Sequence, residues 1–221
     1  TEEAGFGRTN IHDVVAEKCL AVRNRVGVTD LSSFAKYDVT GADAEDFLNR
    51  ITANRIAKRQ GGITLTHLLG DNGMIHSEAT ISCLAEGHYY VLSGAFAQHR
   101  DLDHLRLPIR TDEDVEIEDI SDDWGVLVVA GPKSRETLAK ITAVDMTNDN
   151  FRWLSGQVIE MAGIELRALR VNYVGELGWE LHVPMNQLEP LYDAIWSAGE
   201  SLGTADFGVD AVTSLRMEKA Y

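Results

Sequence analysis

The stretch GQVIEMAGIELRALRVNYVGELGWELHVP, residues 156–184, decides the class of fold. It reads as three strands, because runs of alternating apolar and polar residues are separated by turns that contain glycine. The stretch GITLTHLLGDNGMIHSEATISCLAEGHYYVLSG, residues 62–94, reads in the same way, with turns at GDNG and EG. A segment with helical periodicity follows each of these two meanders. The two halves of the chain are therefore expected to look alike.

The remaining segments predict helices around these strands. A helix is expected to begin at His12 and to stop at Gly27, and a strand is expected in FAKYDVTG, residues 34–41. Further helices are expected in residues 42–52, 95–107, 133–142 (with Ser134 as a possible cap) and 185–203. This order favours an α+β fold, in which antiparallel sheets carry helices on one face, over a doubly wound parallel sheet. We expect residues 1–110 to form the first α+β half and residues 111–221 the second.

The composition excludes several classes of function. The formal net charge of −15 over 221 residues disfavours binding to nucleic acid or to an anionic membrane surface, and no apolar run is long enough to cross a bilayer. The sequence has no HExxH motif or Cys/His cluster, so no metal site is expected. It also lacks a GxGxxG turn after a strand and a phosphate-binding P-loop, so no nucleotide is expected. Cys19 and Cys83 are expected to be reduced core residues.

Polar chemistry is concentrated in YVGELGWELHVP, residues 173–184. Strand alternation places Glu180 and His182 on one face and Trp179 on the other. If two strands pair across the VGELG turn, the phenol of Tyr173 and the carboxylate of Glu180 come close together. The alternative, which these residues alone favour, is an exposed hairpin with Glu180 in solvent.

Two further segments carry candidate residues. In GDNGMIHSEATIS, residues 70–82, Glu78 is flanked by small residues. Partial burial there would raise the pKa of its carboxyl toward the range of a general base, whereas an exposed strand glutamate is the simpler alternative. SLRMEKAY, residues 214–221, reads as a helical end, and a solvated face of ion pairs that includes Arg216 is its default interpretation.

Taken in order, four segments resemble the motifs of the aminomethyltransferase family, which includes the T-protein of the glycine cleavage system. These segments are VRNRVGVTDLSSFAKYDVTGADAEDFLNRITAN (22–54), HLLGDNGMIHSEATI (67–81), YVGELGWELHVP (173–184) and SLRMEKAY (214–221). Their wording is closest to the folate-binding C-terminal half of FAD-dependent sarcosine and dimethylglycine dehydrogenases. The resemblance implies a T-protein-like folate-binding fold with ferredoxin-like duplicated halves. It also implies a C-terminal β-barrel and a flavin domain; the sequence contains neither, so it is expected to be a fragment or to have lost them.

The resemblance also assigns roles to residues. It implies that Glu180 pairs with the pterin ring of tetrahydrofolate and that Tyr173 lines the site. Trp153, in FRWLSG, matches loosely the aromatic residue that packs on folate, and Tyr221 falls on a further pocket position. Glu78 falls on the catalytic carboxylate, which is usually Asp in the family.

Two departures from the T-protein pattern favour the dehydrogenase branch. Glu stands for Asp at position 78, and Val212 stands where the T-protein has an Arg near the pterin. The implied function is methylene transfer to tetrahydrofolate within an N-methylamine dehydrogenase, with FAD held only by an N-terminal flavin domain of the same polypeptide.

The alternatives are a stand-alone aminomethyltransferase, a dimethylsulfoniopropionate-type demethylase, and a non-catalytic folate-binding module. The last class includes iron–sulfur maintenance proteins, whose KGCYxGQE motif is absent from this sequence. The protein is expected in the cytoplasm if it is bacterial and in the mitochondrial matrix if it is eukaryotic.

Overall fold

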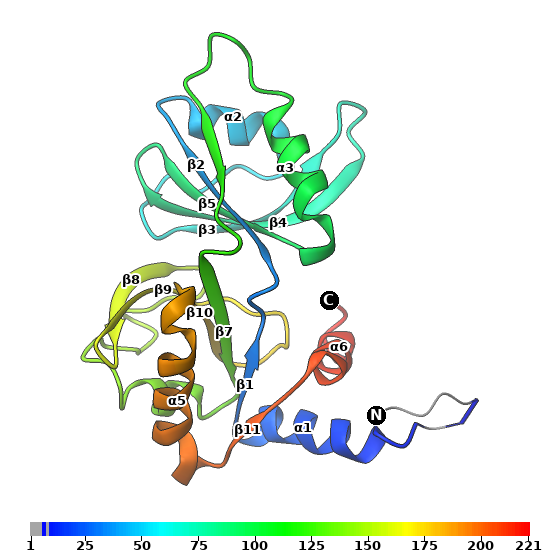
Figure 1. The fold of residues 1–221 in the computed structure, drawn as a ribbon, viewed down its shortest axis with the longest axis vertical. Helices are drawn as coiled ribbons and strands as arrows, with labels where there is room; N and C mark the ends of the chain where they lie inside the picture. Colours follow the sequence, from blue (N-terminus) through cyan, green and yellow to red (C-terminus); the bar gives the residue numbers. More distant parts are fainter. Residues whose placement is uncertain (1–5, 8) are drawn as a thin grey trace. The chain divides into compact units, whose positions relative to one another are not determined.

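The computed structural model describes residues 6, 7 and 9–221 and divides the chain into two compact units (Figure 1). Unit 1 comprises Thr1–Asp30, Leu127–Arg152 and Val158–Tyr221, and unit 2 comprises Leu31–Val126 and Trp153–Gln157. This division does not coincide with the expected halves, residues 1–110 and 111–221. The physical reason is strand pairing, because the first strand of the chain hydrogen-bonds to strands from its second half.

Unit 1 is built around a six-stranded sheet with the order β11-β1-β7-β10-β9-β8, which lies in this unit apart from the first residues of β7 and β8. Its strands are β1 (Val26–Asp30), β7 (Trp124–Ala130), β8 (Gly156–Met161), β9 (Ile164–Leu169), β10 (Gly178–Pro184) and β11 (Thr204–Asp206). Its helices are α1 (His12–Asn24), α4 (Ser134–Leu138), α5 (Leu188–Gly199) and α6 (Val209–Glu218), with short 3₁₀ turns at Met185–Gln187 and Glu200–Leu202. The β1–β7 and β9–β10 pairs are antiparallel, as expected, whereas β1 and β11 pair in parallel.

The core of unit 1 lies between β10 and α5. Trp179, Leu181 and Val183 alternate along β10 and pack in one buried cluster with Leu191 and Ile195 of α5. The helical spacing of the apolar residues in α5 turns one face of that helix toward the strand, and strand alternation turns every second residue of β10 toward the helix. The other face of β10 therefore remains for polar residues.

Unit 2 contains a five-stranded sheet with the order β3-β4-β5-β2-β6. Its strands are β2 (Ala35–Thr40), β3 (Ile63–Leu69), β4 (Ile75–Ala85), β5 (His88–Ser93) and β6 (Glu116–Asp119), and all four pairings are antiparallel. The helices α2 (Ala44–Ile51) and α3 (Gln98–Arg106), the latter preceded by a 3₁₀ turn at Ala95–Ala97, contribute Phe47, Leu48 and Leu105 to the core on this sheet. The β3–β4–β5 meander that the sequence predicts is therefore confirmed, as is the β8–β9–β10 succession in unit 1.

Two local expectations were wrong. Gly27 does not stop the first helix, which ends at Asn24; it lies inside β1, where a Cβ would come within 2.6 Å of Val22 and 2.7 Å of Phe207. Ser134 does not cap α4, because its hydroxyl donates instead to the carbonyl of Leu177 over 3.1 Å. In both cases the residue takes part in a tertiary contact and does not end or cap a local helix. Within the described residues, the structure contains no helix that is both long and apolar enough to cross a membrane.

Candidate functional site

Glu180 lies on β10 in unit 1, with its side chain turned away from the core. Its neighbours Trp179 and Leu181 belong to the buried cluster, whereas Glu180 shares the opposite face with His182, and the two side chains approach to 3.4 Å between Nε2 and Oε2. This alternation is as predicted. The exposed hairpin was wrong, because Glu180 is only 5% exposed and His182 is fully buried. The strand β10 lies inside the sheet, where it is flanked by β7 and β9.

Tyr173 lies in the loop between β9 and β10, not on a strand as expected. The strand β9 ends at Leu169, and residues 170–177 form the connection. The side chain of Asn172 organises this loop: its Nδ2 donates to the carbonyl of Glu176 over 3.0 Å, and its Oδ1 accepts from the amide of Val174 over 3.1 Å. A side chain therefore replaces the strand pairing that would otherwise satisfy these backbone groups.

Two glycines permit the close approach of this loop to its surroundings. Gly175 has a φ of +75°, and a Cβ there would lie 2.3 Å from the side chain of Lys219. At Gly178, a Cβ would lie 2.7 Å from Nδ2 of Asn172 and 2.8 Å from the carbonyl oxygen of Val129. The spacing of the two glycines thus reflects a left-handed turn followed by a tight backbone contact.

The phenol of Tyr173 and the carboxylate of Glu180 are electrostatic neighbours, as the sequence suggests. Burial raises the pKa of Tyr173 to about 12, the negative charge of Glu180 adds to this shift, and the positive charge of Arg216 opposes it. At neutral pH the phenol is therefore protonated and available as a hydrogen-bond donor. Tyr173, Glu180 and Arg216 are called the unit 1 cluster below.

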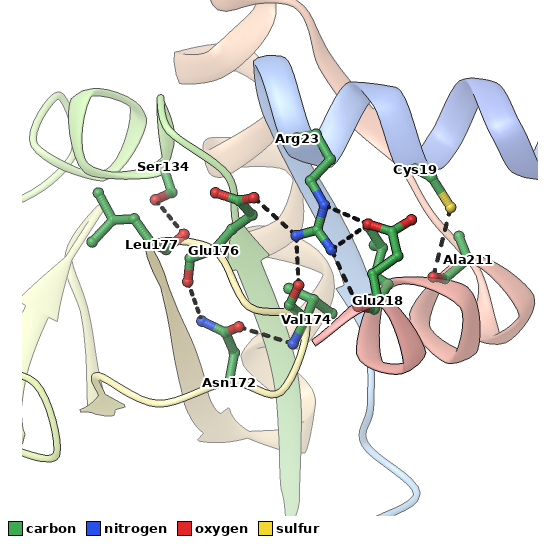
Figure 2. A network of polar contacts seen from close by, with 10 residues as sticks. Cys19, Arg23, Ser134, Asn172, Val174, Glu176, Leu177, Ala211 and Glu218 are labelled. Carbon is green, nitrogen blue, oxygen red and sulfur yellow. Dashed lines mark hydrogen bonds and ion pairs between the residues drawn. The ribbon is translucent and has the colours of Figure 1, made fainter. Parts of the chain in front are cut away.

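Arg216 is the member of this cluster that the sequence did not identify. It lies on an exposed face of the last helix, as expected, and its guanidinium donates to the backbone carbonyl of Tyr221 over 3.2 and 3.3 Å. The side chain of Tyr221 itself is 57% exposed. Glu218 of the same helix pairs with Arg23 of α1 at 2.8 Å (Figure 2). No local pattern signals this partner, because the two residues are far apart in the sequence.

Glu78 lies in unit 2, on β4, directly opposite His67 of β3. Its side chain is 87% exposed, and its Oε1 lies 3.7 Å from Nε2 of His67. Of the two alternatives, the exposed strand glutamate is confirmed and partial burial was wrong. Strand alternation explains the difference, because Ala79 takes the buried face of β4 and Glu78 consequently faces the other way.

Trp153 also belongs to unit 2. The short segment 153–157 is tied to this unit by hydrogen bonds from the Ile63 amide to the Leu154 carbonyl, 3.2 Å, and from the Gly156 amide to the Gly61 carbonyl, 2.7 Å. The indole itself is 66% exposed. Of the five residues predicted for the site, unit 1 therefore holds Glu180, Tyr173 and Tyr221, and unit 2 holds Glu78 and Trp153. Val212, the position of the missing family arginine, is buried on α6.

Comparison with known proteins gives a match to the family model described as the GCVT N-terminal domain, over residues 3–221. Mouse (Mus musculus) dimethylglycine dehydrogenase, a mitochondrial protein, is 38% identical over 217 residues, which are 98% of this chain and 25% of that protein. Human (Homo sapiens) sarcosine dehydrogenase, also mitochondrial, is 32% identical over 235 residues, with 100% of this chain and 26% of that protein covered. The chain thus spans about a quarter of the length of these curated relatives.

A third relative is the formaldehyde-forming 4-methylaminobutanoate oxidase of Paenarthrobacter nicotinovorans, 33% identical over 221 residues, which cover 100% of this chain and 27% of that protein. Among solved structures, the glycine cleavage system aminomethyltransferase T of Bartonella henselae matches with a TM-score of 0.82 at 20% identity. That match covers 100% of this chain and 59% of the other. It confirms the expected α+β, T-protein-like fold. Because the family match extends over residues 3–221 and relatives above 30% identity cover nearly the whole chain, this protein belongs to the aminomethyltransferase family, as a GCVT N-terminal domain related to dimethylglycine and sarcosine dehydrogenases.

Proposed function

We propose that this chain binds tetrahydrofolate and transfers a methylene unit to it, as part of an FAD-dependent dehydrogenase of sarcosine or dimethylglycine. Membership of the aminomethyltransferase family supports one-carbon transfer, and relatives named dimethylglycine dehydrogenase and sarcosine dehydrogenase support the amine class. Since this chain spans about a quarter of those relatives, the proposal assigns FAD and the choice of amine to an adjacent N-terminal flavin domain of the same polypeptide. The mitochondrial relatives support the mitochondrial matrix as its location in a eukaryote; a bacterial protein would act in the cytoplasm.

The observation that carries the proposal is the burial of Glu180 beside Tyr173. A buried carboxylate is costly unless it meets hydrogen-bond donors, and the edge of a pterin ring offers a row of N–H donors that one carboxylate can accept. Like any tyrosine phenol at neutral pH, that of Tyr173 is protonated, so it offers a donor and a flat apolar wall to the same ring. The acceptor on Glu180 and the donor on Tyr173 therefore fit the polar edge and the flat face of a reduced folate.

Tetrahydrofolate, when bound, supplies two nitrogens that together take up one carbon. In the proposal, Glu180 accepts hydrogen bonds from the pterin and Tyr173 lines its face. Glu78 carries the proton that leaves a folate nitrogen. The family resemblance supports this role, and its 87% exposure leaves the carboxylate accessible to a ligand. By the same resemblance Trp153 packs on the folate and Tyr221 forms a further wall.

One relative supports a second candidate. The oxidase of Paenarthrobacter nicotinovorans is named as formaldehyde-forming, so in that protein the carbon is released. On that basis a chain of this family can accompany an N-methylamine oxidation without passing the carbon to folate, which supports a non-catalytic folate-binding module as the second candidate for this chain. A stand-alone aminomethyltransferase and a dimethylsulfoniopropionate-type demethylase are less well supported by the named relatives.

Binding and product analysis on the full-length protein test the proposal. We expect 5-formyltetrahydrofolate, a stable reduced folate, to bind with micromolar or tighter affinity in a calorimetric titration. With sarcosine or dimethylglycine as substrate, added tetrahydrofolate should lower the yield of free formaldehyde and give methylene-tetrahydrofolate in equal measure. Binding without any change in free formaldehyde would favour the non-catalytic module. No binding at all would overturn the proposal.

A further inference from the structure

The side chain of Arg23, on α1, connects three segments of unit 1 that are distant in the sequence (Figure 2). Its NH1 donates to the carbonyl of Val174 over 2.7 Å and to Oε1 of Glu176 over 2.9 Å, both in the β9–β10 loop. Its Nε and NH2 donate to Oε2 of Glu218 over 3.0 and 2.8 Å, and NH2 also donates to the carbonyl of Leu215 over 3.1 Å, both on α6. One guanidinium thus joins α1, the loop and the last helix.

These contacts use every donor that Arg23 has. A guanidinium carries five N–H groups in a rigid plane, and five hydrogen bonds are formed. The side chain is 18% exposed. Burial disfavours its charge, but the bonds to Glu218 and Glu176 outweigh this effect, so the pKa of Arg23 is raised. With no donor left for a ligand, Arg23 acts only through the groups it holds.

The two carbonyls that Arg23 binds are placed next to the unit 1 cluster. Val174 directly follows Tyr173, and Leu215 directly precedes Arg216. The bond to Val174 therefore restrains the backbone next to Tyr173, and the bond to Leu215 restrains the backbone next to Arg216, whose charge acts on Tyr173. Without the guanidinium, the carboxylates of Glu176 and Glu218 would lose their shared counterion and repel one another, which would push the loop away from α6.

We propose that Arg23 is a positioning residue that holds Tyr173 in place between its electrostatic neighbours Glu180 and Arg216, and so sets the geometry of the pterin site. The role of Arg23 in a pterin site rests on the proposed function, but the placement of Tyr173 can be measured without any ligand. Lys cannot fully replace Arg at this position. Its single ammonium group cannot reach all four acceptor groups, which are the two carbonyls and the two carboxylates that the planar guanidinium contacts.

The test is the titration of the Tyr173 phenol in the full-length protein, followed by NMR of ring-labelled tyrosine and assigned with Tyr173→Phe. In the wild type the pKa is raised to about 12 by burial and by Glu180, against the opposing charge of Arg216. In Arg23→Gln the loop should open and the phenol should gain solvent, so its pKa should fall by about one unit toward the ordinary value near 10. Arg23→Lys should fall between the two.

Arg50→Gln is the matched control. Arg50 also holds a carboxylate and a backbone carbonyl, since its guanidinium contacts both oxygens of Glu113 at 2.6 Å and the carbonyl of Pro108 at 3.2 Å, and it is 28% exposed. It lies in unit 2, so its loss should leave the titration of Tyr173 unchanged. If Arg50→Gln shifted Tyr173 as much as Arg23→Gln does, the effect would be general loosening and the inference would be wrong.

Affinity for 5-formyltetrahydrofolate separates the two proposals. We expect it to fall at least fivefold in Arg23→Gln, to recover partly in Arg23→Lys, and to stay at the wild-type value in Arg50→Gln. Absence of folate binding in the wild type would end the proposed function, while the phenol titration would still decide the placement role. An unchanged Tyr173 in folded Arg23→Gln would overturn the inference even if folate binds. If that variant does not fold, Glu176→Gln, which removes one anchor only, decides by the same titration.

Discussion

Replacing Glu180 by Gln changes the charge of the unit 1 cluster while it keeps the shape of the side chain. Glu180 is 5% exposed, so its carboxylate has little water to compensate it; Nε2 of His182 lies 3.4 Å from one of its oxygens, and a bound pterin would provide further donors. An amide offers one oxygen acceptor and turns an NH₂ donor toward the pterin in place of the second oxygen. The variant should therefore lose one hydrogen bond and place two donors face to face.

The expected loss follows from the energy of hydrogen bonds to charged groups, about 1.5–3 kcal/mol each. Because a tenfold change in affinity corresponds to about 1.4 kcal/mol, reduced folate should bind about 10- to 150-fold more weakly. The same substitution should lower the pKa of Tyr173 from about 12, since the negative charge that opposes phenolate formation is gone. That pKa should remain above the ordinary value near 10, because burial is the larger cause of the shift.

Calorimetric titration with 5-formyltetrahydrofolate measures the affinity, and the tyrosine titration measures the phenol. Glu165→Gln is the matched control, because Glu165 lies on the neighbouring strand β9 but is exposed, and it should change neither quantity. An affinity of Glu180→Gln within twofold of the wild type would refute the pairing of Glu180 with the pterin. A Tyr173 titration that does not move would refute the electrostatic contact between the two residues.

Three more predictions concern unit 2. Glu78→Gln in the full-length protein should slow methylene transfer by about 10²–10⁴-fold in a stopped-flow assay and leave folate affinity within a few-fold; equal transfer rates would show that this exposed glutamate has no catalytic role. Lys36→Met should lower the free energy of unfolding, measured in urea, by roughly 1–3 kcal/mol. The buried ammonium of Lys36 donates to the carbonyls of Ser32, Phe34 and Ser121 at 2.8 Å each, and these acceptors would lose a charged donor. An unchanged free energy of unfolding would mean that apolar packing of the methionine compensates. Burial, together with the charge of the stacked His76, lowers the pKa of His104, so the unfolded chain binds this proton more readily than the folded chain. The free energy of unfolding should therefore decline as the pH falls from about 6.5 toward the lower pKa of the folded state. His104→Phe should flatten that decline, and an identical pH profile in the variant would contradict the shift.

The local features of this protein follow from its amino-acid sequence alone. Period-two alternation was enough to predict both meanders and the opposite faces of Trp179 and Glu180, because side-chain direction in a strand depends only on the neighbours in the chain. The four ordered motifs were enough to predict the family. Short-range signals of this kind survive in any sequence that must form the same strands and turns.

Burial and long-range contacts, in contrast, depend on how the strands and helices pack together. Glu180 and Glu78 both lie on inner strands and both face away from a core cluster, yet Glu180 is 5% exposed and the side chain of Glu78 is 87% exposed, so the packing on each sheet face decides their burial. Arg23 meets Glu176 and Glu218 across 153 and 195 residues of chain, and no local pattern encodes such a contact. The physical reason is that burial and ion pairing depend on which strands and helices become neighbours, and that choice is made by the free energy of the whole packed unit rather than by any one segment.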